Sequence, residues 1–90
     1  CWYVDSRHAG ARHVPAFAVD AVDTTGCGDV FHGVYAAMLA RGIALDARIR
    51  IASAAAAMKA RLPGGQDGCP TLDQLRTFLQ AAAPEAACVL

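Results

Sequence analysis

The amino-acid sequence predicts an α/β fold in which short strands come first and helices follow. Three observations support this prediction. Strand-like apolar runs flank a polar turn in residues 1–19, a glycine-rich motif occupies residues 23–31, and apolar residues recur at helical spacing beyond it. The chain has 90 residues, 56% of them hydrophobic, and no net charge. These values describe at most one small, compact domain and exclude a disordered chain or one that coats nucleic acid.

The first predicted elements are two short strands. Residues 1–4 (CWYV) and 11–19 (ARHVPAFAV) have strand composition, and the polar stretch between them contains Gly10, which supplies backbone freedom for a turn. Pro15 has no amide hydrogen to donate to a neighbouring strand. We therefore expect the second strand to lie at a sheet edge or to be irregular near this proline.

Three helices are predicted after the motif. The first carries its apolar residues at helical spacing and ends near a glycine: Val30, Phe31, Val34, Met38, Leu39 and then Gly42. The second covers residues 45–61 and is rich in alanine, with one apolar face formed by Leu45, Ile49, Ala52 and Ala56. A loop with two prolines and three glycines follows at 62–70. Thr71 and Gln74 then form a capping box that opens a third helix, with Leu72, Leu75, Phe78 and Leu79 on one face.

The four cysteines are too far apart to form a Cys-x-x-Cys metal or redox site. Scattered thiols favour a cytoplasmic protein, although a disulfide in a secreted protein remains the alternative. No apolar run reaches the roughly 20 residues that span a bilayer. We therefore expect a cytoplasmic location, with no nucleic-acid or membrane partner.

The motif at 23–31 reads Asp-Thr-Thr-Gly-Cys-Gly-Asp-Val-Phe and precedes a predicted helix. Its small residues leave backbone N–H groups uncovered at the helix N-terminus, which is typical of an anion site. Asp29 would repel a bound phosphate, unless it accepts a proton from a hydroxyl that attacks this phosphate. The alternative is purely structural, with Asp23 or Thr24 capping the helix and the glycines turning the chain.

Two better-known phosphate loops do not match this motif. A Walker A loop requires a lysine, and the only lysine in the chain is Lys59. A dinucleotide-binding fingerprint needs a small residue where this chain has Phe31.

The letters D-T-T-G-C-G-D closely resemble the second signature of the ribokinase-like, or PfkB, family of carbohydrate kinases, usually written D-T-x-G-A-G-D. Cys27 replaces the common alanine and is nearly as small. The order of elements also follows the family over nearly the whole chain. The resemblance implies a ribokinase-like three-layer α/β/α fold, of which residues 1–90 form the C-terminal segment of a single kinase domain. The N-terminal part and the lid are then absent, and the segment alone should be inactive.

The resemblance also implies a reaction, in which the γ-phosphate of ATP is transferred to a sugar hydroxyl with magnesium present. Asp29 corresponds to the catalytic base. The amides of Gly26, Cys27 and Gly28 correspond to an anion hole for the migrating phosphoryl group. The implied partners are ATP and a small sugar, and we expect the full-length protein to be a homodimer.

Further residues are implied to bind the cofactor or a cation. Residues matching the nucleotide site are Thr25, Ser53, Ala56, Gly64 and Gly65. Asp23 and Thr25 match positions that help bind a monovalent cation such as K⁺ in many relatives, together with carbonyls of the loop at 60–69. Some relatives have a serine where this chain has Gly68, so one ligand is missing here and K⁺ dependence is in question.

Several alternatives stay open at this point. Asp23 is equally well explained as a cap, and the small residues at 53 and 56 as close helix packing. His32 fits a solvated or hydrogen-bonded structural residue better than an acid–base group. The same signature also serves nucleoside kinases and related vitamin kinases. A non-catalytic remnant that only binds nucleotide is a further alternative, although such a protein gains nothing from a carboxylate facing phosphate.

Overall fold

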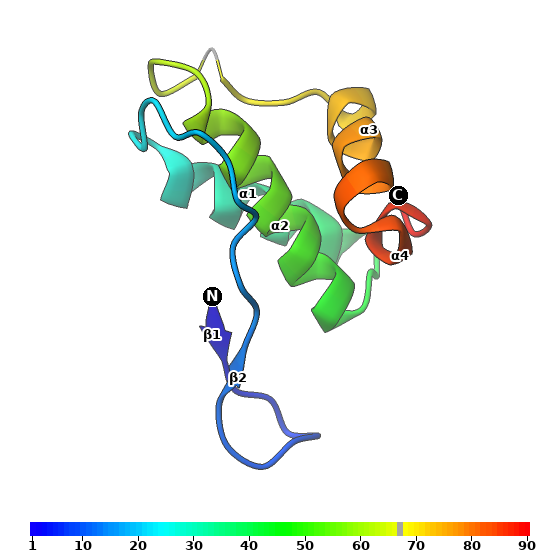
Figure 1. Cartoon of the computed structure of the whole chain (residues 1–90). Helices are drawn as coiled ribbons and strands as arrows, with labels where there is room; N and C mark the ends of the chain where they lie inside the picture. Colours follow the sequence, from blue (N-terminus) through cyan, green and yellow to red (C-terminus); the bar gives the residue numbers. More distant parts are fainter. Residues whose placement is uncertain (67) are drawn as a thin grey trace.

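The computed structural model describes residues 1–66 and 68–90, so residue 67 of the predicted glycine-rich loop lies outside it. A hairpin of β1 (Trp2–Tyr3) and β2 (Arg12–His13) is followed by α1 (Cys27–Ala40), α2 (Leu45–Ala60), α3 (Leu72–Ala82) and α4 (Pro84–Ala87) (Figure 1). No helix within the described ranges is long and apolar enough to cross a membrane. The order of elements is the predicted one, with α4 as an addition.

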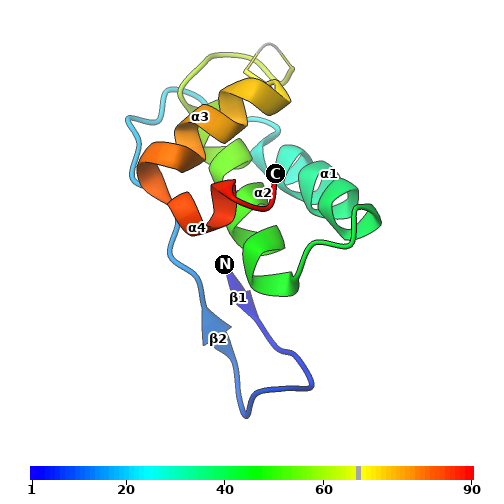
Figure 2. The same cartoon turned by 90° about the vertical axis from the view of Figure 1, so that its right-hand side faces the viewer.

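The hairpin is shorter than the sequence predicted. β1 and β2 are antiparallel, with Trp2 opposite His13, and Gly10 in the turn has a φ of 73°. The predicted second strand continued to residue 19, but only Arg12–His13 is regular. Pro15 cannot donate a ladder hydrogen bond, and no third strand pairs with the hairpin among the described residues. The hairpin therefore extends away from the helices (Figures 1 and 2).

A side-chain contact links the hairpin to the helices. The hydroxyl of Tyr3 donates a hydrogen bond of 2.6 Å to a carboxylate oxygen of Asp46, in the first turn of α2. Residues 14–26 then run back along α2 as an irregular segment and lead into α1 (Figure 1). This connecting segment carries the glycine-rich motif to the start of α1.

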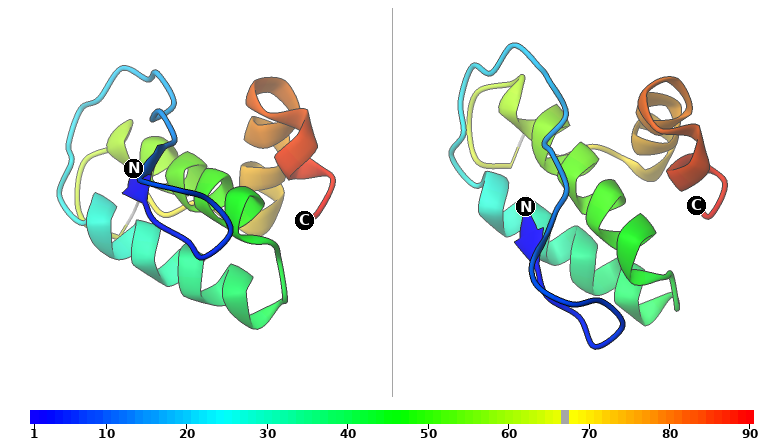
Figure 3. Two further views of the ribbon diagram at one scale, coloured as in Figure 1. Left: turned by 90° about the horizontal axis from the view of Figure 1, so that it is seen from below. Right: turned by 60° about the horizontal axis from the view of Figure 1, so that its bottom comes forward.

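Helix α2 is the centre of the fold. It lies between α1 on one side and α3 and α4 on the other (Figures 2 and 3). Its alanines allow these close approaches, and residues on several of its faces are buried, including Ile49, Ile51, Ala52 and Ala55. The single apolar face predicted for this helix is therefore too narrow, because α2 has neighbours on both sides. The main buried cluster comprises Met38, Ile43, Ile51, Ala54, Ala55, Leu75, Leu79, Ala83 and Ala86.

The predicted helix ends are confirmed where local signals define them. Gly42 directly follows the C-cap residue of α1 and has a φ of 73°. At α3, the Thr71 hydroxyl accepts from the Gln74 amide at 3.2 Å, and the Thr71 amide donates to the Gln74 side chain at 2.8 Å. Helix α4 was not predicted; it begins at Pro84, whose missing N–H costs no helical hydrogen bond there.

Candidate active site

The glycine-rich motif meets the loop after α2 at Gly26. This residue is the N-cap of α1, makes no side-chain cap, and has a φ of 78°. A Cβ atom at this position would lie 3.2 Å from the carbonyl oxygen of Gly65. Glycine is required here both by the left-handed backbone and by the close approach of the second loop.

Asp23 joins the same two segments through its carboxylate. One oxygen accepts the Thr25 amide at 2.9 Å, and the other accepts the Gly64 amide at 3.0 Å. Hydrogen bonds from the hydroxyl and amide of Thr25, and then from the amide of Gly64, lower the pKa of Asp23 to about 2. Asp23 is thus a bridge between the loops, and it does not occupy the N-cap position of α1.

The start of α1 presents unpaired amides. The Cys27 amide donates to the Thr24 carbonyl at 3.1 Å, within the turn that enters the helix. The amides of Gly26, Gly28 and Asp29 have no acceptor among residues 1–66 and 68–90. These N–H groups and the dipole of a 14-residue helix favour an anion at this end of α1.

Asp29 lies in the first turn of α1 and is exposed. Its carboxylate makes no hydrogen bond to the residues that the structure describes, so it is available to a substrate. His32 is also exposed, and its ring lies edge-on to that of Phe31, with 5.9 Å between the centroids. Exposure alone does not distinguish the structural from the acid–base interpretation of His32.

An apolar cavity of about 500 Å³ lies between the start of α1, the middle of α2 and the connecting segment. Cys27 and Gly28 line it from α1, and Ser53 and Ala56 line it from α2. The Cys27 thiol donates to the carbonyl of Ala56 at 3.5 Å. Four of the residues predicted from the motif and from the second helix therefore share one cavity.

Thr25, Gly64 and Gly65, the other predicted nucleotide residues, do not line that cavity. They lie instead against Asp23 and Gly26 at the motif. The predicted site residues thus form two adjoining groups, with the motif common to both.

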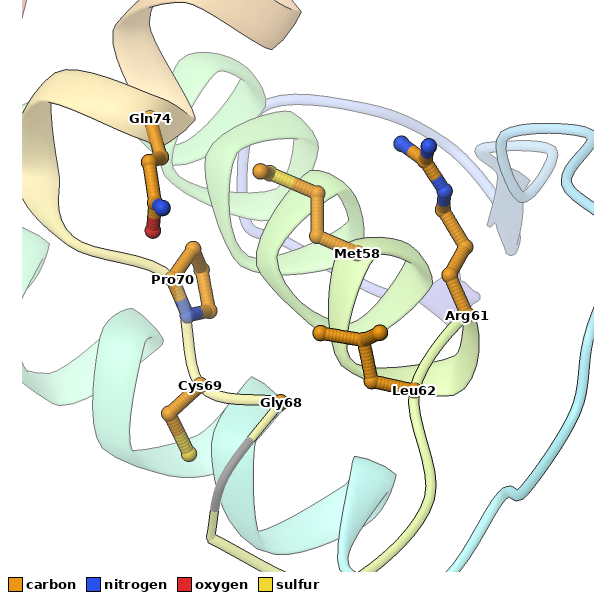
Figure 4. A pocket seen from close by; sticks show the side chains of 7 residues that line it. All are labelled: Met58, Arg61, Leu62, Gly68, Cys69, Pro70 and Gln74. Atoms are coloured by element: carbon orange, nitrogen blue, oxygen red, sulfur yellow. The ribbon is translucent and has the colours of Figure 1, made fainter.

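A second cavity, of about 300 Å³, was not predicted. It lies between the end of α2, the loop that follows and the start of α3 (Figure 4). Its lining comprises Met58, Arg61, Leu62, Gly68, Cys69, Pro70 and Gln74. It contains none of the motif residues, and no local sequence pattern indicates it, because the lining comes from three separate elements.

Lys59 is the residue of this region that sequence reasoning missed. It lies in the last turn of α2 and is fully buried. Its ammonium group donates to the carbonyls of Asp23 at 3.0 Å and Leu62 at 3.4 Å. The one available signal was a single lysine within an alanine-rich helix.

Comparisons with known proteins agree with the motif. The family model described as pfkB family carbohydrate kinase matches residues 1–72. Ribokinase of Bacillus subtilis is 40% identical over 73 residues, which are 79% of this chain and 25% of that protein. Aminoimidazole riboside kinase of Salmonella typhimurium is 40% identical over 77 residues, which are 80% of this chain and 24% of that protein.

A solved structure shows the same likeness. The crystal structure of a putative ribokinase II from E. coli, in complex with ATP and Mg²⁺, superposes with a TM-score of 0.80 at 29% identity. The match covers 89% of this chain and 25% of that one. The chain therefore spans about a quarter of the length of the relatives it matches, and its fold is that part of a ribokinase-like α/β fold.

Proposed function

The chain belongs to the PfkB family of carbohydrate kinases, and we propose that it is the C-terminal segment of an ATP-dependent kinase that phosphorylates a sugar hydroxyl. The observation that carries this proposal is the start of α1. There an exposed carboxylate, Asp29, lies beside three amides that have no acceptor among the described residues. A site that only held a phosphate would gain nothing from this carboxylate.

In the proposed reaction, the sugar hydroxyl oxygen attacks the γ-phosphorus of ATP. A new P–O bond forms, the bond from the γ-phosphorus to the β–γ bridging oxygen breaks, and ADP leaves with that oxygen. Asp29 accepts the proton of the hydroxyl. The amides of Gly26 and Gly28 stabilise charge on the migrating phosphoryl group, and that of Cys27 can join them only by giving up its bond to Thr24.

We propose that the nucleotide base binds in the apolar cavity between α1 and α2. A volume of about 500 Å³ is within the range of small-molecule sites, and the small side chains of Ser53 and Ala56 leave room for a flat ring. Gly64 holds the motif from the other side through its hydrogen bond to Asp23, and Gly65 lies close to Gly26. The ATP and Mg²⁺ in the E. coli ribokinase II complex support ATP as the phosphate donor.

Magnesium is proposed to accompany ATP. The described residues contain no group of three or more His, Cys, Asp and Glu side chains that could hold a metal ion. Mg²⁺ is usually held by one or two carboxylates together with the phosphates of the nucleotide, so such a group is not needed.

A nucleoside is the second candidate acceptor. The observation that favours it is the 40% identity to an aminoimidazole riboside kinase, which is as high as the identity to ribokinase. The motif acts on the hydroxyl and the phosphate, so it does not distinguish the two acceptors.

The test is a coupled ADP-release assay of the full-length protein against sugars, sugar phosphates and nucleosides, with Asp29→Asn beside the wild type. Loss of a general base should reduce kcat by about 10²- to 10⁴-fold, with ATP affinity largely kept. Asp73→Asn is a matched control, because Asp73 is also an exposed aspartate in the first turn of a helix.

Near wild-type turnover of Asp29→Asn would exclude Asp29 as the base. A wild-type protein that binds ATP and phosphorylates no acceptor would instead favour the non-catalytic alternative.

A further inference from the structure

The buried lysine of α2 has no role in the proposed reaction. Lys59 is the only lysine of the chain, and its side chain is 0% exposed. An ammonium group has three donors and no acceptor, and burying it is costly unless acceptors face it. The carbonyls of Asp23 and Leu62 provide these acceptors, at 3.0 and 3.4 Å.

These two carbonyls belong to the two segments that form the site. Asp23 opens the motif, and Leu62 opens the loop that contains Gly64 and Gly65. The amide of Asp23 also donates to the carbonyl of Ala60, at 3.1 Å. Lys59 therefore places a positive charge at the junction of the motif and the glycine-rich loop.

The resemblance implied that a monovalent cation is held at this junction by Asp23, Thr25 and carbonyls of the loop. The residues in this structure do not fit such an ion. The Asp23 and Leu62 carbonyls already face the ammonium group of Lys59. A metal cation bound among these carbonyls would be repelled by Lys59.

The residue at position 68 also argues against a bound monovalent cation. Some relatives have a serine there, but in this chain a Cβ atom at Gly68 would lie 2.9 Å from the carbonyl oxygen of Lys59. Real Cβ atoms do not approach a backbone oxygen so closely, so a serine would require the backbone to shift. The backbone of α2 and the loop therefore leaves no room for a serine ligand at position 68.

We propose that the ammonium group of Lys59 takes the place of a bound monovalent cation and holds the motif against the glycine-rich loop, so that the protein does not require K⁺. Lys59 is a positioning residue, because it acts through the backbone of the motif. The effect on catalysis rests on the proposed kinase function, whereas the effect on structure does not.

The experiment compares the full-length protein in KCl and in choline chloride at equal ionic strength, with the midpoint of thermal unfolding and ADP release as separate readouts. For the wild type we expect the same unfolding midpoint in both salts and rates within about twofold. Lys59→Ala should lose about tenfold or more in kcat/KM in choline chloride, because two carbonyls lose their donor. KCl should restore both its rate and its unfolding midpoint, since the shortened side chain leaves space for the ion.

Two further variants separate charge from packing. Lys59→Met fills a similar volume without charge, so it should lose activity as Lys59→Ala does but should not respond to K⁺. Arg41→Met removes an exposed cation outside the site and should behave as the wild type in both salts.

A wild-type protein that is activated about tenfold by KCl, or whose unfolding midpoint rises by about 5 °C with K⁺, would overturn the proposal. Unchanged activity of Lys59→Ala in choline chloride would overturn it as well. If Lys59→Ala does not fold in either salt, the comparison of the wild type in KCl and in choline chloride still tests the proposal. If the wild type phosphorylates no acceptor, the proposed function fails, and the unfolding midpoints still test the role of Lys59.

Discussion

Replacing Gly26 by alanine would introduce a Cβ atom where the motif meets the glycine-rich loop. The φ of 78° costs an alanine about 1–2 kcal/mol. The new Cβ would also lie 3.2 Å from the Gly65 carbonyl oxygen and 3.5 Å from the Gly65 Cα, and overpacking of this kind costs about 1–3 kcal/mol. Alanine also lowers the conformational entropy of the unfolded chain, which offsets about 0.4–1 kcal/mol of this loss. We expect a net loss of about 3 kcal/mol.

Two other glycines of α1 provide matched controls. A Cβ atom added at Gly33 or at Gly28 would have no neighbouring atom within 4 Å, and neither residue has a positive φ. Gly33→Ala should stabilise the protein by up to about 1 kcal/mol, because alanine is the better helix former. Gly28→Ala should be equally well tolerated by the fold, yet it should raise the KM for ATP, because its methyl group would lie beside the amides proposed to bind phosphate.

The assay is urea unfolding of the full-length protein and the three variants, with the midpoint and slope fitted separately. Gly26→Ala should lower the midpoint with an unchanged slope. If Gly26→Ala is as stable as Gly33→Ala, the close approach of the two loops is wrong, and with it the geometry of the candidate site.

Two more predictions follow from single contacts. The pKa of Asp23 is lowered from 3.8 to about 2, so its stabilising effect is complete above about pH 4 and is lost as the pH falls toward 2. Between about pH 4 and pH 2, the free energy of unfolding of Asp23→Asn should therefore fall less steeply with decreasing pH than that of the wild type. An equal pH dependence in the two proteins would contradict the bridge to Thr25 and Gly64. Thr71→Ala removes the capping box with Gln74 and should destabilise the protein by about 1 kcal/mol in urea unfolding, whereas Thr71→Ser should not. A serine variant as unstable as the alanine variant would show that the hydroxyl is not the stabilising group.

Local patterns in the sequence were sufficient to predict α1, α2 and α3, but not the short helix α4. The capping box at Thr71 and the glycine after α1 are confirmed, because both act between residues a few positions apart. The position of Asp29 in the first turn of α1 also follows from the motif alone. Its role as the base stays a prediction.

The strands were less predictable. Residues 11–19 have strand composition, but a strand also needs a partner, and only Arg12–His13 finds one in the hairpin. The apolar face predicted for α2 failed for a related reason. Burial of a helix depends on how many neighbours it has, and α2 has them on both sides.

By itself, the sequence determined the motif, the end of α1, the start of α3 and the family, since each depends on residue types at short, regular spacings. Only the tertiary structure decided how Asp23 and Lys59 are used. Asp23 accepts an amide 41 residues away, and Lys59 donates to a carbonyl 36 residues away. Contacts over such separations depend on how the loop after α2 packs against the motif, and no local sequence pattern predicts that packing.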